Sequence, residues 1–273
     1  MNNTIVSVKW LHENLNDPDL IILDASQTKT INNTISKFQG LQIKNARFFD
    51  IKNSFSKKDT ELPNMLQNST EFEQECRKLG IHKSSKIVVY DNSDVISSCR
   101  CWYNLIYFGH DPKLVHVLDG GLKKWKKENK TTNNKKAITE ASIYSCKENI
   151  ELVKNKKQID ENIDKNDFNV VDARSRERFE GKVAEPRKGL RSGSIKNSFC
   201  LPFGELINND RTFVSKDKIS EKFKSFNFDH SKNIVFSCGS GVTASVLSLA
   251  YSLINDKYMP TIYDGSWSEY GKS

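Results

Sequence analysis

The chain carries an internal duplication, and this feature limits its possible folds more than any other. Three stretches of the first half recur in the same order in the second half; the matched ranges are 20–26 with 169–175, 86–93 with 233–240, and 117–122 with 262–267. In the first pair the aspartates Asp24 and Asp172 are 148 residues apart, and the other two pairs are offset by 147 and 145 residues. Three matches in one order, at nearly one offset, indicate two copies of the same structural unit.

Each copy has the pattern of an α/β domain. Apolar runs of four or five residues, bounded by polar turns, alternate with segments of helical spacing, as buried parallel strands and their helices do. The clearest helix follows Cys238, where Val242, Val246 and Leu249 share one face, and Ser7 is the predicted N-cap of a first helix. We therefore expect tandem α/β domains, each a parallel sheet flanked by helices on both faces.

The length of 273 residues suits two domains of ordinary size. Between the copies, the polar and charged stretch 126–136 has no hydrophobic period and is typical of an exposed linker. We expect a first domain over 1–128, a linker over 129–144 and a second domain over 145–273.

Composition excludes several classes of protein. No apolar stretch reaches the ~18–20 residues of a membrane helix, and the first residues show neither a secretion signal nor a transit peptide, so we expect a cytoplasmic protein rather than a mitochondrial one. The net charge of +8 comes mainly from scattered lysines, which does not predict a nucleic-acid surface. The six cysteines form no CxxC pair and the five histidines no i, i+4 pair, so we expect reduced thiols and no metal site.

Cys238 stands in a setting that favours a reactive thiol. A buried strand over 234–237 runs into it, a turn containing Gly239 and Gly241 follows, and a helix comes next. The glycines let the backbone curl with successive N–H groups pointing inward, and the helix N-terminus adds partial positive charge. Both features favour a thiolate nucleophile that can carry a second sulfur atom as a persulfide.

Cysteine phosphatases have a similar layout, but they need an arginine six positions after the cysteine to hold a phosphate dianion. Ala244 occupies that position here, and the loop 239–243 carries no charge. The sequence therefore disfavours a phosphatase, and a small inorganic dianion meets no cation within this loop.

The cysteine loop 238–244 and the stretch 263–271, Tyr-Asp-Gly-Ser-Trp-Ser-Glu-Tyr-Gly, together resemble the two-domain rhodanese family, and most closely its 3-mercaptopyruvate sulfurtransferase branch. The resemblance covers nearly the whole chain; supporting stretches are 48–51, 62–66, 108–111, 119–121 and 171–174. In that family the second domain carries the cysteine and the first is catalytically silent, which agrees with Asp91 at the position equivalent to Cys238. The resemblance implies an active-site loop consisting of Gly239, Ser240, Gly241, Val242 and Thr243.

The resemblance also implies a reaction. The expected enzyme moves sulfur from 3-mercaptopyruvate through a Cys238 persulfide to a thiol acceptor, such as thioredoxin or a small thiol, releases pyruvate and needs no cofactor. The mercaptopyruvate branch has a Gly-Ser/Thr-Gly-Val-Thr loop, whereas thiosulfate enzymes carry basic residues after the cysteine. Two alternatives stay open: a thiosulfate sulfurtransferase, and a sulfur-relay protein for tRNA or cofactor thiolation.

A keto-acid substrate needs cations for its carboxylate, and arginine forks supply them best. The stretch 174–187 offers four arginines. The resemblance selects Arg178 and Arg187 as the substrate-binding pair, and we interpret Arg174 and Arg176 as surface or structural residues.

Two positions depart from the family pattern. Lys52 stands where the family usually has an acidic residue, and Asn64 stands where it often has histidine. In the family these two residues are proposed to polarise the loop serine, here Ser240, which we expect to be catalytic. The sequence thus keeps the serine and lacks its expected base, and it leaves open whether turnover is reduced.

Overall fold

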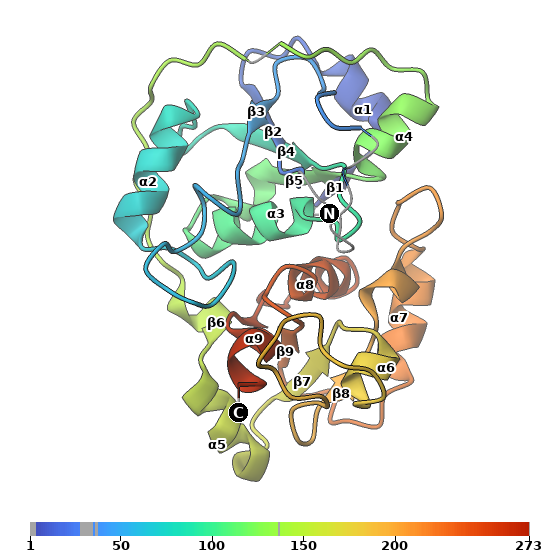
Figure 1. The fold of residues 1–273 in the computed structure, drawn as a ribbon. Helices are drawn as coiled ribbons and strands as arrows, with labels where there is room; N and C mark the ends of the chain where they lie inside the picture. Colours follow the sequence, from blue (N-terminus) through green and yellow to red (C-terminus); the bar gives the residue numbers. More distant parts are fainter. Residues whose placement is uncertain (1–3, 28–34, 36–37, 136, 273) are drawn as a thin grey trace. The chain divides into compact units, whose positions relative to one another are not determined.

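The chain divides into two units in a computed structural model that describes residues 4–27, 35, 38–135 and 137–272. Unit 1 consists of Met1–Lys58, Leu66–Asn149 and Asn209–Phe213, and unit 2 of Asp59–Met65, Ile150–Asn208 and Val214–Ser273. Figure 1 shows the helices and strands of both units, coloured along the sequence.

Unit 1 is built on a parallel sheet with the strand order β1-β5-β4-β2-β3. Its strands are β1 (Ile5–Val6), β2 (Leu20–Asp24), β3 (Arg47–Phe48), β4 (Lys86–Tyr90) and β5 (Val115–Leu118). Its helices are α1 (Val8–Glu13), α2 (Ser69–Lys78), α3 (Ser98–Tyr107) and α4 (Gly121–Lys127). The Ser7 side chain accepts a hydrogen bond from the Trp10 N–H at 3.1 Å, so the predicted N-cap of α1 is confirmed.

Unit 2 repeats this plan with the parallel order β6-β10-β9-β7-β8. Its strands are β6 (Val153–Lys154), β7 (Asn169–Asp172), β8 (Phe199–Cys200), β9 (Ile234–Ser237) and β10 (Ile262–Tyr263). Its helices are α5 (Lys156–Lys165), α6 (Arg176–Phe179), α7 (Lys216–Lys224), α8 (Ala244–Ser252) and α9 (Ser266–Tyr270). Because the two strand orders coincide element by element, the predicted duplication and the predicted α/β class are both confirmed.

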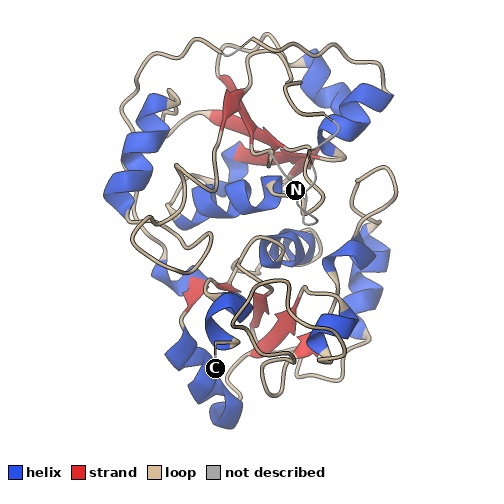
Figure 2. Cartoon of the chain, in the orientation of Figure 1, coloured by secondary structure: helices blue, strands red, loops and turns tan. Residues whose placement is uncertain are grey.

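Helices cover both faces of each sheet (Figure 2). In unit 1, residues of α1 and α4 pack in one cluster with Ile22 and Val88, while α3 packs against β4 and β5. In unit 2, Ile159 of α5 and Trp267 of α9 pack with Val235 of β9. The predicted helix after Cys238 is α8, and its residues 244–250 are all buried, which agrees with a sequence of apolar residues and serines that carries no charge.

The structure differs from the sequence-based boundaries at the linker. The described residues of 129–144 belong to unit 1, and the division between the units comes at Asn149 and Ile150. Tyr144 is fully buried, with its ring beside those of Phe72 and His110, so the end of this polar stretch packs onto the first domain. The segment also contains Ile138 and Ile143, but both are largely exposed, so the buried Tyr144 anchors it.

The two units also exchange short segments. Residues 59–65, from the first half of the chain, belong to unit 2, and residues 209–213, from the second half, belong to unit 1. Glu61 and Asn209 are 148 positions apart, which is the offset between Asp24 and Asp172 in the duplication. This exchange makes Asn64 part of unit 2, the unit that contains Cys238.

Candidate active site

Cys238 lies at the carboxyl end of β9, one short turn before α8 begins at Ala244. Its exposed fraction is 1%, so its thiol is nearly enclosed by protein. Gly241 has a φ of +77°, a conformation that side-chain-bearing residues rarely adopt, which explains one glycine of the predicted loop. Val242 and Thr243 complete the turn into α8, and Val242 is buried.

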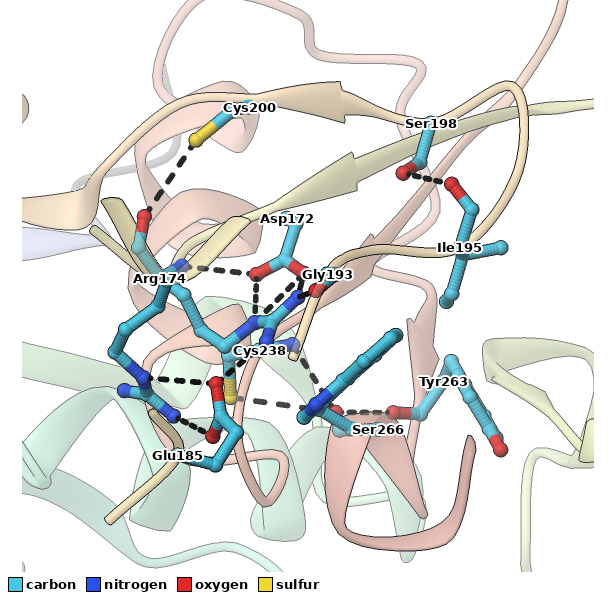
Figure 3. A network of polar contacts seen from close by, with 12 residues as sticks. Asp172, Arg174, Glu185, Gly193, Ile195, Ser198, Cys200, Cys238, Tyr263 and Ser266 are labelled. Atoms are coloured by element: carbon cyan, nitrogen blue, oxygen red, sulfur yellow. Dashed lines mark hydrogen bonds and ion pairs between the residues drawn. The ribbon is translucent and has the colours of Figure 1, made fainter. Parts of the chain in front are cut away.

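The segment that opens α9 supports the cysteine loop. The Trp267 N–H donates to the Cys238 carbonyl at 2.9 Å, and the Ser268 N–H donates to the Gly239 carbonyl at 2.9 Å. The Cys238 N–H donates to Ser266 Oγ at 3.1 Å, and the same hydroxyl lies 4.0 Å from Cys238 Sγ (Figure 3). Ser266 Oγ in turn donates to the Tyr263 carbonyl at 2.8 Å, so the end of β10 fixes the hydroxyl in place.

The duplication provides an internal comparison for Ser266. Its counterpart in unit 1 is Gly121, since the Leu122 N–H donates to the Asp91 carbonyl just as Trp267 does to Cys238. The φ values are +51° for Gly121 and +47° for Ser266. Glycine adopts this conformation freely, whereas serine pays about 1 kcal/mol for it. Unit 1 has glycine there, and unit 2 has a serine whose hydroxyl contacts the Cys238 thiol.

We expect Ser266→Gly to lower the rate of Cys238 chemistry without destabilising the fold. Glycine adopts the positive φ at this position without strain, which stabilises the fold, whereas the Cys238 N–H loses its acceptor, which destabilises it. The two effects on the free energy of unfolding should cancel to within about 1 kcal/mol. The rate of persulfide formation and the melting temperature measure the two effects separately. An unchanged rate would show that the hydroxyl serves only the fold.

The cysteine loop presents unused backbone donors. Within the part of the chain that the structure describes, the N–H groups of Ser240, Val242 and Thr243 donate to no acceptor. These donors sit between a strand end and the N-terminus of the nine-residue helix α8. Such an arrangement can stabilise an anion held beside the loop.

Both predicted substrate arginines meet this loop. A Cβ atom added to Gly239 would lie 3.3 Å from Arg187 Nη1 and 3.4 Å from Arg178 Nη2, so the two guanidinium groups lie against the backbone beside Cys238. Burial lowers the pKa of Arg187, the Cys238 thiolate opposes this effect, and the charge of Arg178 adds to it. The fold therefore brings Cys238, Arg178 and Arg187 together from β9, from α6 and from the loop that follows α6.

Arg178 is already engaged with a carboxylate. Its Nε and Nη2 atoms donate to Glu185 at 3.1 and 2.6 Å, and Arg174 Nη1 donates to the same carboxylate at 2.8 Å (Figure 3). Burial alone would raise the pKa of Glu185, but Arg178 and Arg174 outweigh it and hold that pKa below its usual value. Arg187, by contrast, lies within 4.0 Å of no carboxylate oxygen of the described residues.

The remaining arginines of this stretch have structural or surface roles, as interpreted from the sequence. Arg174 is 2% exposed, binds Asp172 at 2.8 Å and lies 4.2 Å above the ring of Trp267. Burial opposes its charge, but the neighbouring carboxylates outweigh this and raise the pKa of Arg174. Arg176 is largely exposed and pairs with Glu205 at 2.6 Å.

The hydroxyl oxygen of Ser240 accepts hydrogen bonds from two side chains. Asn64 Nδ2 donates to Ser240 Oγ at 3.0 Å, and Arg187 Nη2 donates to the same atom at 3.2 Å. Asn64, which stands where the family often has histidine, is therefore itself a hydrogen-bond partner of Ser240. Lys52, the other departure, belongs to unit 1.

Sequence reasoning missed two residues of this site, Ser266 and Glu185. Ser266 could have been found by comparing the repeats, because Asp264-Gly265-Ser266 aligns with Asp119-Gly120-Gly121. Glu185 carried no signal of its own, since a glutamate in a charged loop is most often exposed.

The first copy has no thiol at the position equivalent to Cys238. Asp91 replaces the cysteine, and its carboxylate accepts from the N–H groups of Ser93 at 2.7 Å and Ser98 at 3.0 Å. Across the residues with described positions, no group of three or more histidine, cysteine or acidic side chains is arranged to hold a metal ion. A search of the same residues finds no helix with the length and apolar character needed to cross a bilayer.

Comparison with known proteins agrees with the geometry. The family model of the rhodanese-like domain matches twice, over residues 7–128 and 155–273. Curated relatives include a 3-mercaptopyruvate sulfurtransferase of Escherichia coli K12, 32% identical over 97% of this chain and 94% of the relative, and one of Mus musculus, 35% identical over 97% and 91%. A thiosulfate/3-mercaptopyruvate sulfurtransferase of Arabidopsis thaliana mitochondria is 35% identical over 97% and 75%.

The solved structures point the same way. The crystal structure of SseA from Escherichia coli, a 3-mercaptopyruvate sulfotransferase, superimposes with a TM-score of 0.85 at 29% identity, over 98% of this chain and 100% of SseA. With both copies matched by one family model, and the thiol in the second, the chain belongs to the rhodanese-like family as a tandem of two rhodanese domains.

Proposed function

We propose that this protein is a 3-mercaptopyruvate sulfurtransferase in which Cys238 carries the sulfur and Arg187 binds the substrate carboxylate. The observation that carries the proposal is the charge beside the thiol. Two of the three guanidinium groups there, those of Arg174 and Arg178, pair with the buried carboxylates of Asp172 and Glu185. Arg187 lies against the loop at Gly239 without a carboxylate partner among the described residues, and its guanidinium fork suits the single carboxylate of a keto acid.

The first half-reaction forms the persulfide. The Cys238 thiolate attacks the sulfur of 3-mercaptopyruvate, an S–S bond forms, and the bond between that sulfur and carbon 3 breaks. The electron pair of the broken bond passes into the enolate of pyruvate, which takes up a proton to give pyruvate. The free N–H groups of Ser240, Val242 and Thr243 would stabilise the outer sulfur as an anion.

The second half-reaction regenerates the thiolate. A thiol acceptor, such as thioredoxin or a small thiol, attacks the outer sulfur as its thiolate, and Cys238 leaves as the thiolate. No cofactor takes part in either half-reaction. Because Cys238 is only 1% exposed, the acceptor sulfur has to approach a thiol that is nearly enclosed by protein.

The choice of sulfur donor tests this proposal. The neutral loop 239–243 offers a thiosulfate dianion no cation, whereas the fork of Arg187 matches the carboxylate of a keto acid, so we expect kcat/KM for 3-mercaptopyruvate to exceed that for thiosulfate by about tenfold or more, or about 1.4 kcal/mol of transition-state preference. Steady-state assays with both donors and one acceptor thiol measure the ratio. Equal efficiency, or a preference for thiosulfate, would place the thiosulfate sulfurtransferase first, and a mouse relative of that name is 33% identical.

A sulfur-relay protein is distinguished by the same assay. Such a protein would turn over free 3-mercaptopyruvate slowly unless a protein acceptor were added. Rapid turnover with a small thiol alone therefore supports the enzyme.

We propose that the protein is located in the cytoplasm. Fluorescence imaging of the tagged protein tests this location, since one relative is a mitochondrial protein.

A further inference from the structure

The hydroxyl of Ser240 is surrounded by donors. Asn64 reaches it through its amide nitrogen at 3.0 Å and Arg187 through a guanidinium nitrogen at 3.2 Å. Ser240 is only 7% exposed, so water has little access to it. For the described residues, no acceptor lies within hydrogen-bonding distance of its own proton.

The number of hydrogen bonds that a hydroxyl can donate and accept determines where the Ser240 proton points. A serine hydroxyl has one proton to donate and two lone pairs to accept with. A guanidinium group can only donate, so Arg187 necessarily uses one lone pair, and the Asn64 amide uses the other. The proton of Ser240 must then point away from both partners, and a buried donor without an acceptor costs about 1–3 kcal/mol.

We propose that Asn64 and Arg187 together lock the Ser240 hydroxyl as a donor to the substrate, with Asn64 acting as a positioning residue. The inference rests on the proposed function, because it assigns the acceptor as the keto oxygen of 3-mercaptopyruvate. Negative charge develops on that oxygen when the carbon–sulfur bond breaks and the enolate forms. A histidine in place of Asn64 could take the serine proton; the amide nitrogen of Asn64 instead keeps that proton on Ser240 and directs it outward.

The backbone of Asn64 supports this assignment. Asn64 has a φ of +59°, a left-handed conformation that asparagine tolerates better than most residues. It lies in the exchanged segment 59–65, between Pro63 and Met65, so its side chain enters unit 2 from a turn rather than from a helix. A short side chain on a fixed turn holds its amide in one orientation with little freedom to rotate.

The substitution Asn64→Asp tests the proposal, because it replaces the amide donor by an acceptor of the same shape. The carboxylate would take the Ser240 proton and withdraw it from the substrate. We expect kcat for 3-mercaptopyruvate to fall by about 100- to 1000-fold, the scale for loss of a donor to a developing oxyanion, with KM changed less than about threefold. Ser240→Ala should cause a similar loss, and Ser240→Thr, which keeps the hydroxyl, should restore most of the rate.

The double variant Asn64→Asp with Ser240→Ala gives the sharpest outcome. If Asn64 acts through Ser240, the double variant is no slower than Ser240→Ala alone. Losses that multiply would show an independent effect of the new charge and would overturn the proposal, as would a wild-type kcat in Asn64→Asp. The matched control is Asn45→Asp, at an exposed asparagine of unit 1 with a φ of +62°, and it should leave kcat unchanged.

Two further readouts separate this inference from the proposed function. Alkylation of Cys238 by iodoacetamide needs no oxyanion, so its rate in Asn64→Asp should match the wild type and show that the loop is intact. A wild-type protein that releases no pyruvate from 3-mercaptopyruvate would refute the proposed function and the inference with it. Normal wild-type turnover together with a normal Asn64→Asp variant would refute the inference alone.

Discussion

Replacing Cys238 with serine is expected to abolish persulfide formation and turnover altogether. A serine hydroxyl at this site would be neither ionised near neutral pH nor able to carry a transferable sulfur atom. After mixing with 3-mercaptopyruvate, mass spectrometry of the wild type should show a peptide containing Cys238 heavier by one sulfur atom. The same peptide of the serine variant should show no gain.

The other cysteines provide the controls. Burial raises the pKa of Cys200 to about 12 and that of Cys146 to about 11, and it raises those of Cys76, Cys99 and Cys101 well above the usual value. These five groups therefore remain thiols near neutral pH and are poor nucleophiles. Cys200→Ser is the matched control, since Cys200 belongs to the same unit, and it should keep most of the activity. A sulfur adduct on Cys200, or an active Cys238→Ser variant, would overturn the mechanism.

The duplication explains why so much of the fold was predictable. Because the two copies have the same strand order, each strand of unit 1 has a counterpart in unit 2. The offset of 148 residues between Asp24 and Asp172, for example, aligns β2 with β7. The strand, turn and helix around Cys238 identified the thiol, the resemblance to the rhodanese family selected the two arginines, and the fold places these residues together. Cys238 directly follows β9, whereas both arginines lie in the segment between β7 and β8.

The parts that could not be predicted depend on contacts between distant segments. Glu185 is decisive because its carboxylate is 1% exposed and shared by Arg174 and Arg178, and no sequence pattern shows that a loop glutamate is buried. The segment exchange that makes Asn64 a partner of Ser240, 176 residues away, has no local signature either. The sequence identified Asn64 as a departure from the family, whereas the structure shows that it donates to the serine.

This sharing of Glu185 leads to unequal roles for the two substrate arginines. Arg178 uses its Nε and Nη2 donors on a buried carboxylate, whereas Arg187 contacts Ser240 and Gly239 and has no carboxylate partner among the described residues. Removing Arg178 leaves Glu185 with Arg174 as its remaining guanidinium partner, so stability should decrease. Removing Arg187 takes away the proposed anchor of the substrate and one of the two donors to Ser240.

We expect Arg187→Leu to lower kcat/KM for 3-mercaptopyruvate by about 10- to 150-fold, which corresponds to about 1.5–3 kcal/mol for a charge-assisted hydrogen bond, with little change in melting temperature. Arg187→Lys should recover only part of this loss, because lysine lacks the planar fork that matches a carboxylate. Arg178→Leu should lower the melting temperature and reduce kcat/KM by a smaller factor. The control is Arg176→Leu, since Arg176 is largely exposed and paired with Glu205. A normal KM in Arg187→Leu, or a larger loss of kcat/KM in an equally stable Arg178→Leu, would move the anchor to Arg178; the structure favours Arg187 because Glu185 already neutralises its neighbour.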